Sequence, residues 1–192
     1  MRITGGALRG RTLRVPNNGK VRPTQDAVRE ALFAMLGARI GGARFLDLFG
    51  GTGAVGLEAV SRGAGEVVWI EGNAGVARNL SENLRSICGS DVPGRVVVAD
   101  AFRWVRRTPA APFDIVFADP PYGAEGVDDG IPALLAAAAA ARVLVPGGIF
   151  VAEQRNLCPP LVSGPEWEPV TARTYGHTRL TLLRFAPQET QQ

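Results

Sequence analysis

The fold class is decided by residues 44–56, which read Arg44-Phe45-Leu46-Asp47-Leu48-Phe49-Gly50-Gly51-Thr52-Gly53-Ala54-Val55-Gly56. The apolar run Arg44–Phe49 predicts a buried strand, and Ala54–Arg62 predicts the helix that follows it. Gly51, Gly53 and Gly56 match the G-x-G-x-x-G spacing, in which glycines permit a tight turn and let a cofactor approach the start of the helix. This stretch therefore predicts a nucleoside-cofactor site in an α/β fold.

Short apolar strands and helices alternate on the C-terminal side of this stretch. Further strands are expected at Val67–Ile70, Arg95–Ala99, Phe113–Ala118 and Ile149–Ala152, and further helices at Ala74–Ile87, Phe102–Arg107 and Val127–Leu144. Near-continuous apolar strands joined by helices are typical of a parallel sheet covered on both faces. Val170–Tyr175 and Leu180–Phe185 predict a terminal antiparallel hairpin. This order predicts a mostly parallel, Rossmann-like sheet of the class I methyltransferase type.

The chain on the N-terminal side is strongly basic. Residues 1–44 hold nine basic residues against two acidic ones, a net charge of +7, whereas the whole chain has a formal net charge of +3. Residues 1–20 predict a hairpin-like segment, and a helix capped by Thr24 or Asp26 is expected to run to Gly37. We expect a basic RNA-binding extension at residues 1–42, a catalytic domain at 43–187 and a tail at 188–192, because a localised positive patch neutralises phosphates.

Composition excludes several other classes of protein. His177 is the only histidine and Lys20 the only lysine, so the chain has no H-E-x-x-H zinc motif and no G-K-[ST] phosphate loop. Cys88 and Cys158 are far apart, which gives no disulfide framework and no zinc motif, and we expect no metal. We find no run of about 20 apolar residues and no secretory signal at Met1. We therefore expect a cytoplasmic protein without a membrane partner, and a monomer.

Three carboxylates lie at the ends of three successive predicted strands, and they favour one cofactor over another. Asp47 precedes the glycines, where NAD would place its pyrophosphate, and a carboxylate there would repel it. S-adenosylmethionine instead carries an ammonium group and a cationic sulfur, so a nearby carboxylate attracts it. Glu71 stands near the spacing expected for a residue that binds ribose hydroxyls, and Asp100 could accept the adenine amino group.

Asp119-Pro120-Pro121-Tyr122, at the end of the strand Phe113–Ala118, predicts the reacting site. Proline fixes φ and has no N–H, so the Asp119 carboxylate and the Pro120 carbonyl become rigid acceptors for the two hydrogens of an exocyclic amine. Tyr122 offers a flat face for a stacked base. Orientation of a weakly nucleophilic aromatic amine toward a sulfonium methyl needs no histidine, thiol or metal.

These motifs resemble those of the bacterial guanine-N2 methyltransferases of 16S ribosomal RNA (the RsmD type). The resemblance rests on the segments beginning at Arg2, Arg9 and Arg22, on Asp47–Gly53 and Asp119–Tyr122, and on Tyr175-Gly176-His177-Thr178. It implies methylation of a guanine N2 in 16S rRNA within the small ribosomal subunit, with S-adenosylmethionine as cofactor. The predicted cofactor residues are Asp47, Gly50, Gly51, Thr52, Gly53, Glu71, Asp100, Ala101 and Asp119. The predicted catalytic residues are Asp119, Pro120, Pro121 and Tyr122, and the predicted RNA contacts are Arg9, Arg11, Arg22, Thr24 and Arg29.

Three alternatives remain to be weighed against this prediction. A DNA adenine-N6 or cytosine-N4 methyltransferase could use the same Asp119–Tyr122 motif, but such enzymes usually need a sizeable domain to read base edges, and about 44 residues precede the core here. An NAD-dependent oxidoreductase would have no use for the Asp-Pro-Pro-Tyr motif. A non-catalytic RNA-binding scaffold would not bind S-adenosylmethionine.

Overall fold

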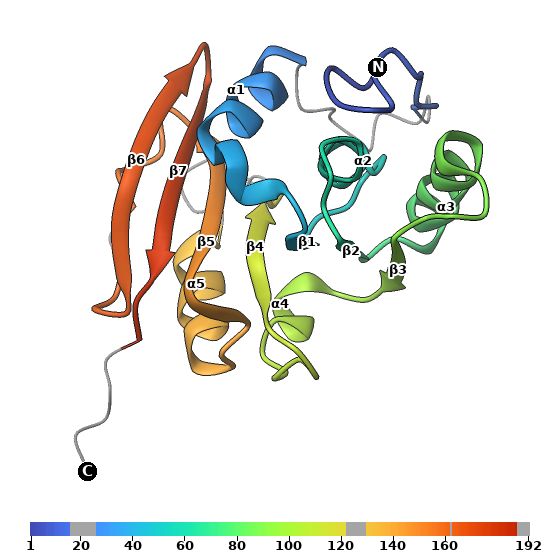
Figure 1. Cartoon of the computed structure of the whole chain (residues 1–192). Coiled ribbons are helices and arrows are strands. Elements are labelled where there is room, and N and C mark those ends of the chain that lie inside the picture. Colours follow the sequence, from blue (N-terminus) through green and yellow to red (C-terminus); the bar gives the residue numbers. More distant parts are fainter. Residues whose placement is uncertain (16–25, 122–129, 162, 188–192) are drawn as a thin grey trace. The chain divides into compact units, whose positions relative to one another are not determined.

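Parallel strands with helices between them make up most of residues 44–98 in the computed structural model (Figure 1). The structure describes residues 1–15, 26–121, 130–161 and 163–187, and the chain divides into two compact units, Met1–Ala101 and Phe102–Gln192. The first unit contains α1 (Asp26–Leu36), η1 (Gly37–Ile40), β1 (Arg44–Asp47), α2 (Ala54–Ser61), β2 (Glu66–Glu71), α3 (Ala74–Cys88) and β3 (Gly94–Val98). The short helix α4 (Ala101–Trp104) begins at Ala101, the last residue of the first unit.

The sheet of the first unit has the order β3-β2-β1, with all strands parallel. Asp47 is level with Trp69, and Glu71 is level with Val98, so the three strands end at one edge. Val67 to Ile70 are fully buried because helices cover the sheet: α2 packs on β1 and β2, and α3 packs on β2 and β3. This is the packing expected of a parallel sheet whose strands are apolar on both faces.

The described part of residues 1–15 folds back on itself and belongs to the first unit. Arg2 and Thr12 form an antiparallel bridge, and the Ile3 amide donates to the Arg11 carbonyl at 2.9 Å. Ile3 and Leu13 are buried, which holds this segment on the unit. The expected hairpin-like shape is therefore present where the chain is described. The domain division at residues 42 and 43 stays a prediction.

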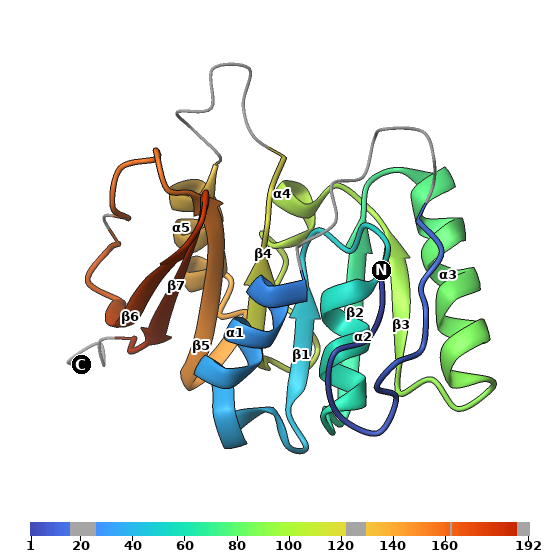
Figure 2. The ribbon, with the colours of Figure 1, turned by 90° about the horizontal axis from the view of Figure 1, so that it is seen from above.

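The second unit contains β4 (Phe113–Ala118), α5 (Ile131–Ala140), β5 (Leu144–Arg155), β6 (Trp167–Tyr175) and β7 (Thr178–Phe185). Its strands have the order β4-β5-β7-β6, with β4 parallel to β5 and both other pairs antiparallel. Figure 2 shows α5 beside β5 and the hairpin β6–β7 following it. Trp167 packs against Phe150 and Phe185, with ring centroids 5.6 Å and 5.2 Å apart, and fixes the hairpin on the sheet.

The predicted fold class is confirmed, and the largest correction concerns β5. The strand expected at Ile149–Ala152 spans Leu144–Arg155, because β7 supplies pairing partners for its C-terminal half. The expected helix start at Val127 lies outside the described residues, and α5 begins at Ile131. None of the helices in the described ranges is long and apolar enough to cross a membrane.

Candidate cofactor, amine and RNA sites

The loop after β1 is built from backbone hydrogen bonds to the neighbouring strand. Asp47, the last residue of β1, is 1% exposed. The Gly50 amide donates to the Ile70 carbonyl at 2.8 Å, and the Gly53 amide donates to the Gly50 carbonyl at 2.7 Å. Gly53 has φ +87° where α2 begins, a conformation that L side chains rarely adopt. The predicted glycine turn is therefore present at the carboxyl end of β1.

Gly56 meets a different requirement from Gly53. A Cβ at position 56 would lie 2.1 Å from Nε1 of the Trp69 indole, so only glycine lets α2 lie this close to β2. The third glycine of the motif is thus explained by helix–strand packing, and it supports the loop without belonging to it.

Glu71 fixes the geometry of the glycine loop. Its Oε2 accepts a hydrogen bond from the Gly51 amide at 2.9 Å, and its Oε1 accepts one from the Asn73 amide at 2.7 Å. An ionised carboxylate has about four acceptor positions, so this arrangement leaves capacity for further donors such as ribose hydroxyls. Glu71 therefore has a structural task that the sequence did not reveal, beside its predicted task in cofactor binding.

The structure brings Asp47, Glu71 and Asp100 to the same edge of the first unit's sheet. The Ala99 amide donates to the Glu71 carbonyl at 3.1 Å and holds the end of β3 beside the end of β2. Asp100 is exposed, whereas Ala101, which begins α4, is buried. The carboxylates at this edge are acceptors with negative charge, which suits a cationic nucleoside better than a pyrophosphate.

The predicted amine site belongs to the second unit. Asp119 is half-buried directly after β4, Pro120 is buried and Pro121 is exposed. Tyr122 lies outside the described residues. Ala118 pairs with Ala152, so Asp119 leaves β4 at the level where β5 continues into Glu153.

Sequence reasoning missed Glu153 and Gln154, which are 5% and 3% exposed on β5. The signal was available, because two polar residues follow the apolar run Ile149–Ala152 within one strand. They lie just past the level at which β4 ends, at the carboxyl-end edge where ligands bind in open α/β sheets.

The predicted RNA contacts divide into exposed and buried residues. Arg9 and Arg11 are exposed, and one guanidinium N–H of Arg11 donates to the Ile87 carbonyl. Arg22 and Thr24 lie outside the described residues. Arg29 is 0% exposed: its Nη2 donates to the Arg2 carbonyl at 2.6 Å and to Asp26 Oδ1 at 2.9 Å. The prediction that Arg29 contacts RNA is wrong, since its guanidinium is used inside the protein.

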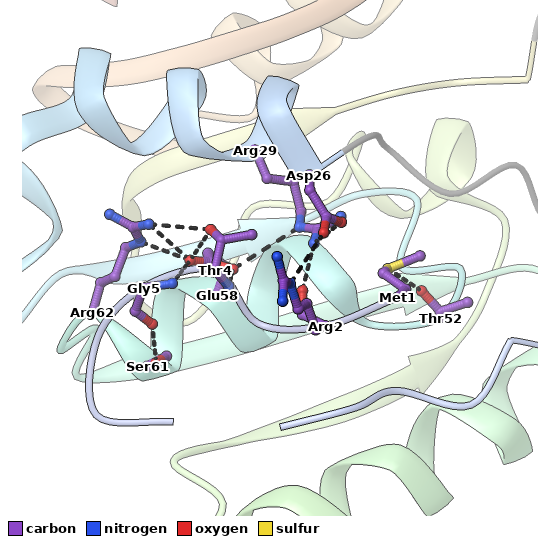
Figure 3. Close-up of polar contacts among 10 residues, drawn as sticks. All are labelled: Met1, Arg2, Thr4, Gly5, Asp26, Arg29, Thr52, Glu58, Ser61 and Arg62. Carbon is purple, nitrogen blue, oxygen red and sulfur yellow. Dashed lines mark hydrogen bonds and ion pairs between the residues drawn. The ribbon is translucent and has the colours of Figure 1, made fainter. Parts of the chain in front are cut away.

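Figure 3 shows that Glu58, on α2, is the centre of the contacts that hold the N-terminal segment, residues 1–15. Its buried carboxylate accepts the amides of Thr4 and Gly5 at 2.8 and 2.7 Å and the Thr4 hydroxyl at 2.8 Å. Arg62 pairs with it at 2.8 Å, and Arg29 Nε lies 3.9 Å from it. Sequence reasoning missed Glu58, although an acid within the apolar helix Ala54–Ser61 was a signal.

Asn83, on α3, joins the N-terminal segment to the glycine loop. Its Nδ2 donates to the Arg14 carbonyl at 3.0 Å and to the Thr52 carbonyl at 2.9 Å, and its Oδ1 accepts the Arg14 amide at 2.9 Å. Asn83 is 2% exposed, and these three hydrogen bonds fix the position of its side-chain amide. The basic segment and the predicted cofactor loop are thus parts of one hydrogen-bonded network. Among the residues that the structure describes, no group of three or more His, Cys, Asp and Glu side chains could hold a metal.

Comparisons with known proteins agree with this architecture. The βα units and terminal hairpin are those of a Rossmann-like methyltransferase fold: a solved structure described as "Putative methyltransferase yhhF from Escherichia coli" is similar with a TM-score of 0.84 and 31% identity, over 98% of this chain and 99% of that one. A family model, "Conserved hypothetical protein 95", matches residues 1–184. The chain belongs to this family.

Two curated relatives are similar over shorter stretches. "Ribosomal RNA small subunit methyltransferase D" of Escherichia coli (strain K12) is 43% identical over 122 residues, which are 64% of this chain and 60% of that protein. "Putative rRNA methyltransferase YlbH" of Bacillus subtilis (strain 168) is 32% identical over 155 residues, or 80% of this chain and 82% of that protein. The similarity to the E. coli relative therefore spans less than two thirds of its length.

Proposed function

We propose that this protein transfers a methyl group from S-adenosylmethionine to the exocyclic N2 amine of a guanine in 16S rRNA of the small ribosomal subunit. The observation that carries the proposal is the Asp119-Pro120-Pro121 loop at the end of the buried strand β4. Membership of the family and the names of the E. coli and B. subtilis relatives support it.

The cofactor would be held by the edge of the first unit. S-adenosylmethionine, when bound, supplies an electrophilic methyl group on a cationic sulfur. The buried Asp47 carboxylate favours positive charge, and Glu71, already oriented by the amides of Gly51 and Asn73, is suited to accept ribose hydroxyls. Asp100 stands exposed at the end of β3, where it can accept an adenine amino group.

Asp119 and Pro120 would orient the amine. Two consecutive prolines remove two backbone donors from this loop, so it presents acceptors to both hydrogens of a guanine N2. Held in this way, the nitrogen lone pair points away from the protein acceptors and toward the incoming carbon. An Asp119 carboxylate oxygen can then take the proton that the nitrogen loses.

The RNA would be bound by the basic N-terminal region. Arg9 and Arg11 are exposed and can reach phosphates. We also propose RNA contacts for Arg22 and Thr24, which lie outside the described residues. A guanine whose N2 is to react must be unpaired or swung out of its stack, because the edge is otherwise paired. Phosphate contacts on either side would fix its register.

The deciding experiment supplies labelled S-adenosylmethionine with naked 16S rRNA, with undermethylated small subunits, or with unmodified DNA. We expect N2-methylguanosine in one or both ribosomal substrates, located by nucleoside analysis and primer extension. Label in DNA adenine or cytosine would replace the proposal by the DNA methyltransferase. Binding of S-adenosylmethionine without transfer to any substrate would contradict both. The comparison of naked RNA with subunits also identifies the form of the substrate, and sedimentation tests the expected monomer.

A further inference from the structure

The second unit carries a basic edge that the site described above does not include. The last pair between β4 and β5 is Ala118 with Ala152, but β5 continues to Arg155. β7 pairs with this extension, up to Arg155 with Thr178. Three further residues extend a strand by about 10 Å, so the turn between β6 and β7 stands beyond the point where Asp119 leaves β4.

Hydrogen bonds join the loop after β5 to this turn. The Asn156 amide donates to the His177 carbonyl at 2.9 Å, and its Nδ2 donates to the Gly176 carbonyl at 3.0 Å. Arg179 Nη2 donates to the carbonyls of Cys158 and Pro159 at 2.5 and 2.8 Å. Residues 155–159 and 173–179 thus form one fixed surface, which we call the β5–β7 edge.

The β5–β7 edge exposes apolar, aromatic and cationic groups together. Leu157 is 83% exposed, although the loop that carries it is held at both ends. His177 is exposed and Tyr175 is half-buried. Arg155 and Arg173 are exposed, and neither segment of the edge contains an acidic residue.

This combination fits single-stranded nucleic acid. Bases stack on aromatic and apolar side chains, while arginines contact the phosphates between them. A duplex offers no free base faces for Leu157 or Tyr175, and an acid-free basic surface disfavours a basic protein partner. The position beside Asp119, on the same side of β4 and β5, places the edge next to the amine site within its own unit.

We propose that the β5–β7 edge binds the unpaired nucleotides that flank the target guanine. Leu157, Tyr175 and His177 contact the flanking bases, and Arg155 and Arg173 contact their phosphates. The proposal rests on the proposed function, because it assumes a target base in RNA. It also gives the Tyr175–Thr178 turn a role in substrate binding.

The test compares two double variants with the wild-type enzyme. Leu157→Ser with Arg155→Ala alters the β5–β7 edge, and Val170→Ser with Arg106→Ala is the matched control. Val170 is an exposed apolar residue inside β6, and Arg106 is exposed and precedes the amino end of β4. All four positions are at the surface, so thermal unfolding should be unchanged in both variants.

The KM for RNA should rise about tenfold in the edge variant, with kcat and the Kd for S-adenosylmethionine unchanged, as expected for loss of a stacked base and a phosphate contact. The control should match the wild type. Photo-cross-linking of RNA with 4-thiouridine beside the target guanine should label Tyr175 or His177 in the wild type.

Two outcomes would overturn two different proposals. If the wild type methylates rRNA while the edge variant keeps its KM, or if both variants lose affinity equally, the β5–β7 edge is not a specific RNA-binding surface and the proposed function stands. If the wild type methylates no RNA, the proposed function is wrong, and so is the proposed role of the β5–β7 edge, which depends on it.

Discussion

The N-terminal segment and the β5–β7 edge are both basic, but different acceptors hold them in place. The N-terminal segment has four arginines and no acid, and it is fixed by buried acceptors on two helices, Glu58 on α2 and Asn83 on α3. The β5–β7 edge is held mainly by backbone carbonyls, which accept hydrogen bonds from Asn156 and from the Arg179 guanidinium, and Arg155 and Arg173 are exposed at its surface. Net charge alone does not show which arginines RNA can reach: Arg9 is exposed, whereas Arg29, which also counts toward the +7 charge of residues 1–44, is buried against Asp26.

The largest effect is expected at the anchor of the N-terminal segment. Glu58→Ala removes the acceptor of Thr4 and Gly5 and leaves Arg62 and the buried Arg29 without this carboxylate. The free energy of unfolding should fall by about 3–5 kcal/mol, the usual effect of breaking a buried ion pair. Urea unfolding measures it, and Glu82→Ala, at an exposed position of α3, is the control. A loss below about 1 kcal/mol would show that Glu58 is not the anchor.

The next largest effect is expected on the rate of methyl transfer, while RNA binding by the two basic regions should change little. Asp119→Ala should lower kcat by at least ~10²-fold, as removal of one preorganised hydrogen-bonding group does. The affinities for RNA and for S-adenosylmethionine should change much less, measured by calorimetry. Asp91→Ala, at an exposed position before β3, serves as the control. Parallel loss of rate and cofactor affinity would assign Asp119 to the cofactor.

A pair of arginine variants tests the comparison within the N-terminal region itself. Arg9→Ala should keep its stability and flatten the dependence of log K on log salt by about 0.7–0.9, because one phosphate contact is lost. Arg29→Ala should leave that slope unchanged and lower stability, because its guanidinium is buried against Asp26 and Arg2. Filter binding across a salt series and urea unfolding give both values. A flattened slope with unchanged stability in Arg29→Ala would restore its predicted RNA contact.

The smallest effect concerns another arginine that contributes to the charge of residues 1–44. A hydrogen bond from Arg44, with further attraction from Arg95, lowers the pKa of Glu66 despite partial burial. A carboxyl whose pKa is lowered by folding stabilises the protein at neutral pH, and this contribution is lost as pH falls through the folded-state pKa. Glu66→Gln should remove less than about 1 kcal/mol at pH 7 and nothing in acid. Unfolding of both proteins across this pH range measures the difference, and equal curves would mean that Arg44 adds nothing through Glu66.

Sequence patterns were sufficient to predict those elements whose structure depends on residues close together in the chain. The strand β4 was predicted with both of its ends, and the glycine turn before α2 was predicted from spacing alone. Both depend on local hydrophobic periodicity and on turn residues with special backbone freedom. The acids Asp47, Glu71 and Asp100 could be placed on one edge because parallel strands end together.

What the sequence by itself determined was therefore the fold class, the order of its elements and the positions of the acidic and proline-rich loops. Only the tertiary structure decided the extent of β5, which depends on pairing with β7. It also decided that the side chains of Arg29 and Glu58 are buried close to each other. Thr4 reaches Glu58 across 54 positions of the chain, and Arg14 reaches Asn83 across 69. Long polar side chains find their partners through packing between distant segments, so neither their burial nor their availability to RNA can be derived from local pattern or net charge.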